Sequence, residues 1–575
     1  MMAVGCLFLL LLGSGGARAN SASVSTELSK DVEINSSVPV DVTERTSAET
    51  LLEQLTHTKL SKAAALLEQL EQSGDVRVRA VFQTMLDGAL YYQRDNRQLL
   101  AVRKGEDKSL NASDVFSGES LGVVAKKSVK KIRVNNRLRV YLRGALSRLA
   151  LNADSADDRN IAVMSMLDKL SADNVAALQA LDARETNREV KASIALALAM
   201  NTLATSSDRN QRLAAIEVME GRLEAPVKNQ LQALVDSAVV DNSAAGSSVA
   251  DSSVLDKSLD TQVIAAAQKA LQSIEGKVTA YGYVEQLFFG LSLGSVLLLA
   301  AIGLAITFGV MGVINMAHGE MIMIGAYATF VVQQLMPNFL EYSIWVAIPA
   351  AFLTAGLVGV LIERCVIRYL HGRPLETLLA TFGISLILQQ AVRTIFSPLN
   401  QTVVTPEWMS GSLEINAVLS VTYSRIYIFI FALIVFAALQ LVMKKTSLGL
   451  QVRAVSQNRS MAKSMGIRTD RVDALTFGLG SGIAGIAGVA LSQITNVGPN
   501  LGQAYIIDSF MVVVFGGVGN LLGTLFAGFS LGIANKFLEP ATGAVLANII
   551  VLIFIILFMQ KRPKGLFPQK GRAAE

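Results

Sequence analysis

The sequence predicts an all-α protein in two parts, a helical domain followed by a polytopic membrane helix bundle. Residues 286–317 and 321–340 contain no Asp, Glu, Lys or Arg, and similar apolar stretches recur to the end of the chain. Each is near the ~20 residues that a membrane-spanning helix needs. In the first half, by contrast, Leu and Ala recur among charged residues at helical spacing, as in 51–70. The first half therefore reads as a water-exposed helical domain.

Charge separates the same two halves. Residues 284–575 carry 18 Lys and Arg against 12 Asp and Glu, a net charge of +6, and residues 1–283 carry 33 against 34, a net charge of −1. The basic excess lies in loops between apolar stretches, where it sets membrane orientation, so it does not indicate nucleic-acid binding.

The N-terminal part divides into four segments. Residues 1–19 have an apolar core, CLFLLLL, followed by Ala17-Arg18-Ala19, and are expected to be a signal peptide. The alternative is a short uncleaved anchor, and either would place the next domain outside the cytoplasm. We expect a disordered lead-in at 20–47, a helical domain at 48–240, for which a HEAT-like array is one reading, and a linker at 241–283 that includes an amphipathic helix near 257–275.

One interval of this domain has two readings. Valine and lysine alternate within 103–134, which is consistent with a small β element or with a basic solvated face.

The membrane domain is expected at 284–560, with a basic cytoplasmic tail at 561–575. An irregular glycine-containing stretch at 509–535 is too short for two spans, so we expect a re-entrant or broken-helix hairpin there, giving about eight spans in all. Basic residues predict that 364–376, 444–471 and the C-terminus are cytoplasmic. The remaining spans are expected at 285–306, 318–336, 343–362, 377–396, 425–443, 473–493 and 541–559.

Several kinds of chemistry find no support. Gly480-Ser-Gly482-Ile-Ala-Gly485 matches a dinucleotide fingerprint on paper, but it lies in an apolar span with no strand before it, which indicates close helix packing. There is no GxxxxGK[ST] motif and no nucleophile–base arrangement, so no catalytic residues or cofactor are expected. Three scattered histidines give no metal site.

Asn315, His318 and Glu320 interrupt the first long apolar region. Ionisable groups inside a membrane usually face a bundle interior or a polar pathway. They could contact a solute, or they could hydrogen-bond an interrupted helix in place.

Three motifs in order resemble the permease subunits of ABC importers of the branched-chain amino acid, amide and urea class. INMAHGEMIMIGAY resembles that family's N-x-A-H-G-E-x-x-x-x-G-A-Y signature, RAVSQNRSMAKSMGIRTDR its cytoplasmic loop, and FGGVGNLLGTLFAGFSLGI its glycine-rich late segment. The resemblance covers about 284–572. The long exported N-terminal domain is similar to the first urea-type permease subunit.

The resemblance implies a second homologous permease, two cytoplasmic ATPases and a periplasmic solute-binding protein as partners in a bacterial inner membrane. The helix near 457–466 would be the coupling helix for an ATPase, although it departs from the common EAA-loop pattern. Its expected coupling residues are Asn458, Arg459, Ser460, Met461, Ala462, Met465 and Gly466.

We therefore expect ATP-driven import of urea or a small amide. The alternatives are a branched-chain amino acid permease, an ATP-independent urea channel, and a membrane-anchored scaffold. A neutral polar solute needs amides and hydroxyls along its pathway rather than rings of like charge. The expected pathway residues are Asn315, His318, Glu320, Thr381, Gln389, Asn496 and Asn520.

Overall fold

The computed structural model describes residues 42–58, 63–75, 77–104, 110–244 and 254–567. The chain divides between Lys277 and Val278 into two compact units, which are described separately below. The expected signal peptide at 1–19, and the lead-in as far as residue 41, lie outside the described residues. The last part of the lead-in, from Val42, is helical.

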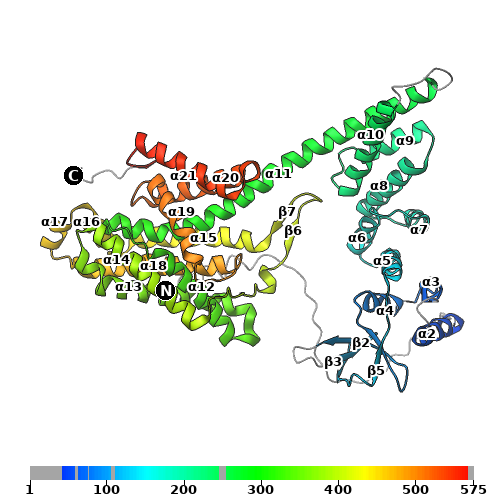
Figure 1. The fold of residues 1–575 in the computed structure, drawn as a ribbon, viewed down its shortest axis with the longest axis horizontal. Coiled ribbons are helices and arrows are strands. Elements are labelled where there is room, and N and C mark those ends of the chain that lie inside the picture. Colours follow the sequence, from blue (N-terminus) through cyan, green and yellow to red (C-terminus); the bar gives the residue numbers. More distant parts are fainter. Residues whose placement is uncertain (1–41, 59–62, 76, 105–109, 245–253, 568–575) are drawn as a thin grey trace, which may run out of the picture. The chain divides into compact units, whose positions relative to one another are not determined.

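Helices form most of the N-terminal unit (Figure 1). Leucines at helical spacing, such as Leu66, Leu67 and Leu70, lie in its core because one face of each helix is apolar. The helices are α2 (Val42–His57), α3 (Ala63–Gln72), α4 (Arg77–Leu86), α5 (Asn136–Ala150), α6 (Ala156–Met166), α7 (Ala172–Asp182), α8 (Arg188–Thr205), α9 (Arg209–Met219), α10 (Ala225–Ala244) and the first part of α11 (Val254–Met311).

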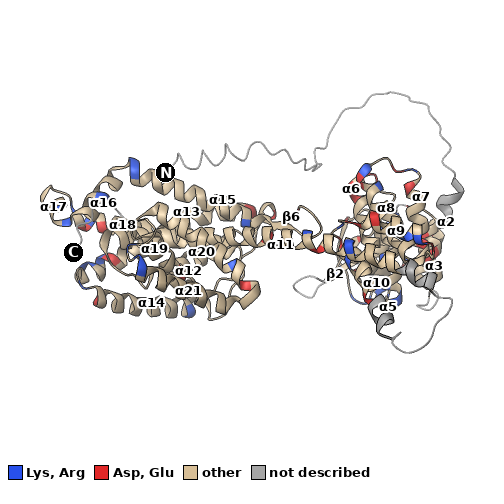
Figure 2. Cartoon of the chain, turned by 90° about the horizontal axis from the view of Figure 1, so that it is seen from above, with Lys and Arg blue, Asp and Glu red and all other residues tan. Residues whose placement is uncertain are grey.

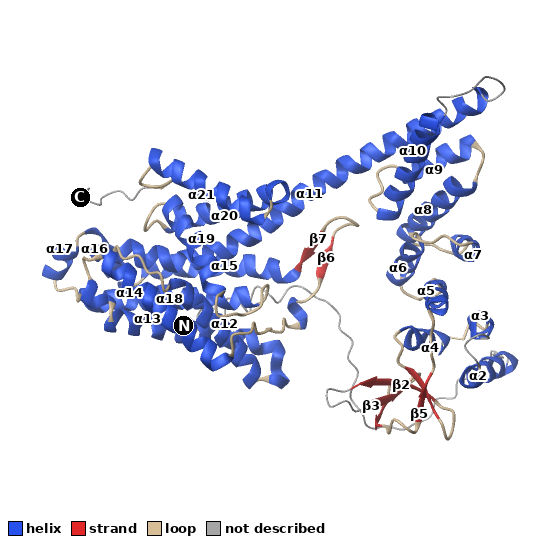
Figure 3. Ribbon diagram, viewed as in Figure 1, coloured by secondary structure: helices blue, strands red, loops and turns tan. Residues whose placement is uncertain are grey.

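Between α4 and α5 lies an antiparallel five-stranded sheet in the order β4-β3-β2-β1-β5 (Figure 3). The β-element reading of 103–134 is therefore correct, but the sheet begins earlier, at Leu90. Leu100, Val102 and Ala112 are buried together, and alternation with exposed residues is the mark of a strand with one covered face. The strands are β1 (Leu90–Gln93), β2 (Leu99–Lys104), β3 (Leu110–Asp114), β4 (Ser120–Val123) and β5 (Val129–Lys131).

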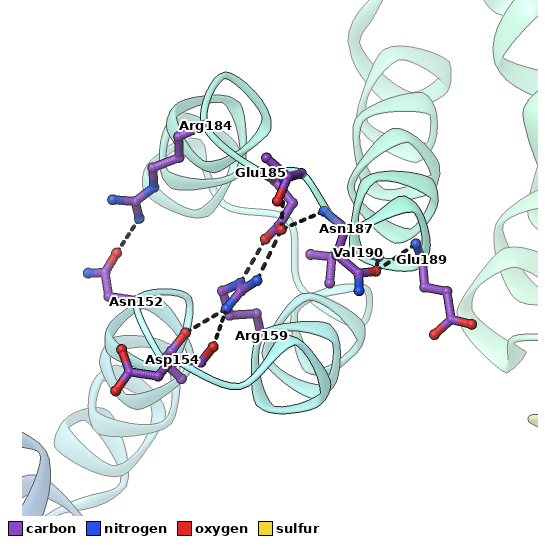
Figure 4. A network of polar contacts seen from close by, with 10 residues as sticks. Asn152, Asp154, Arg159, Arg184, Glu185, Asn187, Glu189 and Val190 are labelled. Carbon is purple, nitrogen blue, oxygen red and sulfur yellow. Dashed lines mark hydrogen bonds and ion pairs between the residues drawn. The ribbon is translucent and has the colours of Figure 1, made fainter.

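An ion pair between the partly buried Arg159 and the buried Glu185 holds the α7–α8 turn against the start of α6 (Figure 4). The Arg159 guanidinium donates to both oxygens of Glu185, at 2.7 and 3.0 Å, and to the carbonyls of Ala153 and Asp154. Glu185 also accepts from the amides of Thr186 and Asn187. All three side-chain nitrogens of Arg159 and both carboxylate oxygens of Glu185 therefore have hydrogen-bond partners. A charged group can be buried at low cost only when its polar atoms are paired in this way.

The second unit is a bundle of apolar helices with few charged residues along their length (Figure 2). Among the described residues, seven helical segments are long and apolar enough to cross a membrane. The helices after α11 are α12 (His318–Leu335), α13 (Leu340–Cys365), α14 (Pro374–Phe396), α15 (Tyr423–Lys445), α16 (Ser447–Gln457), α17 (Arg459–Ser464), α18 (Thr469–Ser492), α19 (Leu501–Gly516), α20 (Leu521–Thr542) and α21 (Ala544–Lys561). Short 3-10 turns η1 (Pro337–Phe339), η2 (Ile367–Leu370) and η3 (Glu407–Met409) and a hairpin of β6 (Ser412–Glu414) and β7 (Ser420–Thr422) connect some of them.

Two expected connections differ from the structure. The amphipathic helix near 257–275 and the first span are one continuous helix, α11, so the chain does not leave helical conformation at 276–283. No Pro interrupts this interval, so no residue in it lacks the backbone N–H that continues the helix. The linker expected from 241 is helical as far as Ala244 and again from Val254.

The apolar stretch 509–535 forms a hairpin broken in its middle, as expected. Helix α19 ends at Gly516 and α20 begins at Leu521. Gly517 and Gly519 have φ angles of 102° and 78°, a conformation that favours glycine. The second arm runs on to Thr542, beyond the expected end of the hairpin at 535, and the next break comes at Gly543.

Glycines bring α18 against three other helices. A Cβ added at Gly480 would lie 2.6 Å from the carbonyl oxygen of Gly303 in α11, and one at Gly485 would lie 2.6 Å from that of Ala351 in α13. A Cβ at Gly325 of α12 would lie 2.0 Å from the oxygen of Gly485. The packing reading of the GxGxxG sequence is therefore confirmed, since only residues without a side chain fit these contacts.

Glu185→Gln is expected to destabilise the N-terminal unit, because it removes the buried carboxylate that pairs with the partly buried Arg159. Hydrogen exchange of the full chain should show faster exchange in α6–α8. Glu189→Gln on the exposed surface of α8 is the matched control and should leave exchange unchanged.

The same contact predicts a pH dependence. The Arg159 hydrogen bond and then the amide of Asn187 lower the pKa of Glu185 from 4.5 to about 2. Its stabilising effect is therefore complete above pH 4.5 and is lost as the pH falls toward 2. Protection of α6–α8 that did not weaken over this range, relative to Glu185→Gln, would contradict the assignment.

Candidate functional site

A six-residue turn, 312–317, joins α11 to α12 and is stabilised by two side chains. The Asn315 side-chain oxygen accepts from the amide of Ala317 at 3.0 Å. Thr381 of α14 accepts from the amide of Met316 at 3.1 Å. Both side chains are buried, so the two predicted pathway residues satisfy backbone groups that the interrupted helix leaves open.

His318 is the first residue of α12 and is fully buried. Its Nε2 lies 2.9 Å from the carbonyl oxygen of Ala300 in α11. A carbonyl can only accept, so Nε2 carries the proton and donates. Nδ1 has no hydrogen-bond partner among the described residues. His318 thus ties the start of α12 to the middle of α11.

Glu320 lies in the first turn of α12 and faces α14. Its Oε1 accepts from the Ser385 hydroxyl at 2.8 Å and from the Gln389 amide at 2.7 Å. The residue is 1% exposed, and its Oε2 has no partner among the described residues. The position near a helix N-terminus also favours a carboxylate.

These contacts belong to a line of buried polar residues along α14, which we call the polar seam: Thr377, Thr381, Ser385 and Gln389. Residues four apart lie on one side of a helix, so the seam forms a single stripe. Other faces of α14 are apolar and exposed, with Leu375, Leu379 and Ile387 each more than 60% exposed. Ser385 was not predicted as a partner of Glu320. Its spacing of four residues from both Thr381 and Gln389 indicates that all three lie on the same side of the helix.

Five of the seven predicted pathway residues therefore lie together, and two do not. Asn496 is exposed in the loop after α18. Asn520 caps α20, where its side-chain oxygen accepts from the amides of Leu522 and Gly523. Neither lies on the polar seam.

The predicted coupling segment is a turn followed by a short helix, α17. The Asn458 side chain caps this helix by accepting from the amide of Met461 at 2.9 Å, and the Ser460 hydroxyl donates to the same oxygen. Gly466 ends the segment with a φ of 87°. Val455 and Ala462 are buried against Val452 and Val472, so this chain itself covers these two apolar positions. Met461 and Met465 are 63% and 79% exposed.

Arg459 connects α17 to the central helix α18. Its guanidinium forms an ion pair with both oxygens of Asp473, which is buried in the first turns of α18. The pair lines a polar cavity of about 990 Å³ that also contains His371 and Glu363. Burial, and then the charge of Arg459, lower the pKa of His371 below its ordinary value, so its ring is neutral at pH 7. The ion pair of Arg459 with Asp473 therefore lies at the wall of this cavity, next to the exposed methionines of α17.

Comparison with known proteins gives a consistent result for the second unit. Residues 286–559 match the family described as branched-chain amino acid transport system / permease component. The high-affinity branched-chain amino acid transport system permease protein BraD of Pseudomonas aeruginosa is 32% identical over 295 residues, which cover 50% of this chain and 96% of the relative. LivH of Escherichia coli, a permease protein of the same named system, is 31% identical over 297 residues, which cover 49% and 95%.

A weaker similarity extends to a sugar permease. The ribose import permease protein RbsC of Bacillus subtilis is 28% identical over 138 residues, covering 22% of this chain and 43% of the relative. No solved structure shows a significant match. The family match begins at residue 286 and so leaves the N-terminal unit outside it.

Gln389→Leu is expected to lower the stability of the bundle, because it removes a donor from the buried carboxylate of Glu320. The loss should be roughly 1–3 kcal/mol. Thermal unfolding of the purified chain, followed by the fluorescence of Trp345 and Trp408, measures it. Gln390→Leu makes the same change at the adjacent exposed position and should have little effect. Equal effects of the two substitutions would mean that the Glu320 contact contributes nothing.

Proposed function

The chain belongs to the branched-chain amino acid transport system permease family, and we propose that it is a membrane subunit of an ATP-driven importer. The match to BraD over nearly the whole length of that relative carries this proposal. Two features of the chain support it. The bundle contains interrupted helices and buried polar groups, which a simple anchor does not need. Helix α17 presents two exposed methionines and carries Arg459, which forms an ion pair with the buried Asp473.

We propose that four partner subunits complete the importer: a second homologous permease, two ATPases and a solute-binding protein. In this arrangement α17, the α13–α14 turn and the C-terminus face the cytoplasm, and the N-terminal unit lies in the periplasm. The basic residues Lys444, Lys445 and Arg453 support this orientation, because basic loops stay on the cytoplasmic side.

In the proposed mechanism, a conformational change in the ATPases displaces α17, and α17 in turn displaces α18. An ATPase groove would hold α17 through Met461 and Met465, since flexible apolar side chains fit such grooves. The ion pair of Arg459 with Asp473 would then transmit displacement of α17 to α18. Because α18 contacts α11, α12 and α13 at glycines, its movement would alter all three helices, including α12, whose Glu320 contacts the polar seam.

Branched-chain amino acids are the cargo that the named relatives favour. We therefore propose a small, net-neutral amino acid as the first candidate. Its carboxylate and ammonium would need matching donors and acceptors, which the second permease could contribute. Asn315, His318 and Glu320 would then position the seam rather than bind the solute, because each already has a backbone or side-chain partner.

Urea or a small amide is the second candidate, favoured by the composition of the polar seam. The seam offers hydroxyls and an amide beside the carboxylate of Glu320, and no Lys or Arg lies among its residues. Such groups suit a solute with N–H donors and a carbonyl, whereas a free carboxylate would lack a cation there. The N-terminal unit, which the matched relatives do not share, also separates this chain from them.

The double variant Met461→Glu/Met465→Glu is expected to release the ATPases. Two charges in an apolar groove should weaken binding by about 2 kcal/mol or more, which is over tenfold in affinity. Quantitative co-purification from native membranes measures the loss. Val123→Glu in the N-terminal unit, 72% exposed, is the matched control. Unchanged recovery of ATPase with the double variant would refute the docking role of α17.

The cargo is tested by ATP-dependent uptake in cells that express this chain from its native locus. Uptake of labelled leucine that disappears when the chain is deleted would support the first candidate, and uptake of labelled urea the second. Uptake that persists after ATP depletion would instead indicate a channel and overturn the importer proposal. No uptake of any tested solute would favour the scaffold alternative.

A further inference from the structure

Glu363 is a buried carboxylate with an unsatisfied oxygen at the end of α13. The residue is 2% exposed, and its Oε2 has no hydrogen-bond partner among the described residues. It lies in the last turn of α13, where the helix dipole presents negative charge. A carboxylate in such a place is unfavourable unless a cation reaches it.

The two arginines that line this cavity are already paired. Arg459 pairs with Asp473, and Arg368 donates to Asp470 at 3.0 Å. Both pairs lie on the walls of the 990 Å³ cavity that Glu363 also lines. In the described state Glu363 is therefore the acidic residue of this cavity for which no ion pair is formed.

Lys463 is the complementary residue on the coupling helix. It lies on α17, is exposed, and forms no ion pair with any described residue. Lys463 and Glu363 both line the 990 Å³ cavity and the adjacent cavity of about 510 Å³. An unpaired cation and an unpaired buried anion thus border the same open space.

We propose that Lys463 forms an ion pair with Glu363 when ATPase closure moves α17 toward α13. The cavity shrinks in this second state, and the pair holds α17 against α13 while Arg459 keeps α17 on α18. Glu363 then acts as a positioning residue for the transport cycle. This inference rests on the proposed function, because it requires an ATPase to displace α17.

Charge reversal tests the pair in the intact complex. Glu363→Lys and Lys463→Glu should each lower ATP-dependent uptake about tenfold, and the double reversal should restore at least about half of it, as expected for directly coupled sites. Lys445→Glu, an exposed lysine at the end of α15 that lines neither cavity, is the matched control and should leave uptake unchanged.

Two results would overturn the inference alone: full uptake by Glu363→Gln, or a double reversal as inactive as the single ones although wild-type uptake depends on ATP. Wild-type uptake that is independent of ATP would overturn the importer proposal and this inference together.

Disulfide trapping measures the approach of α17 to α13 directly, and it can be carried out even if the cysteine variant no longer transports solute. The variant Glu363→Cys/Lys463→Cys is made with Cys6 and Cys365 replaced by Ser, which removes both native cysteines. In complexes held in the ATP-bound state, the disulfide should form several-fold faster than in nucleotide-free complexes. The pair Glu363→Cys/Lys445→Cys controls for general mobility. Equal rates in the two states would show that α17 does not close on α13.

Discussion

Close approach of helix backbones at glycine is the contact on which the membrane unit depends. Lipid is as apolar as leucine, so burial of apolar side chains does little to hold membrane helices together, and packing must do so. Helix α18 meets α11 at Gly480 and α12 at Gly485. This contact sets where His318 reaches the carbonyl of Ala300, since a Cβ at Gly303 would lie 2.9 Å from the imidazole ring. The polar groups of the site are thus positioned by residues that have no side chain.

The sequence was most informative where periodicity and length act together. The apolar spans, the turn before His318 and the broken hairpin near Gly517 follow from length, glycine chemistry and the cost of exposed backbone in lipid. The five-stranded sheet was only one of two readings, because valine and lysine alternate equally well on a solvated surface. Pairing between strands, such as Leu90 with Ala101, is a long-range contact that a local pattern does not contain.

Site residues were predictable as a group but not in their contacts. Asn315, His318 and Glu320 are conspicuous because they interrupt an apolar sequence. Their partners lie elsewhere: Ala300 contributes only a backbone carbonyl, and Ser385 is an ordinary residue in an amphipathic helix. Asn520 looked equivalent to Gln389 in sequence, yet it serves as a helix cap, a role that depends on where α20 begins. The sequence identifies which residues are polar, but only the fold determines which groups they hydrogen-bond.

Two buried carboxylates, Glu320 and Glu363, differ in role. Glu320 makes contacts that are formed in this structure, and Glu363 is proposed to gain its contact in a second state. Glu320 begins a helix and accepts two side-chain hydrogen bonds at Oε1, which hold it against α14 although its Oε2 has no partner among the described residues. Glu363 ends a helix, forms no hydrogen bond through Oε2 with any described residue, and lines the same cavity as Lys463, which has no ion pair among those residues. A rigid protein would gain by replacing such a residue with a neutral one. A protein that alternates between two states can keep it, because the group left unsatisfied in one state is available for the other.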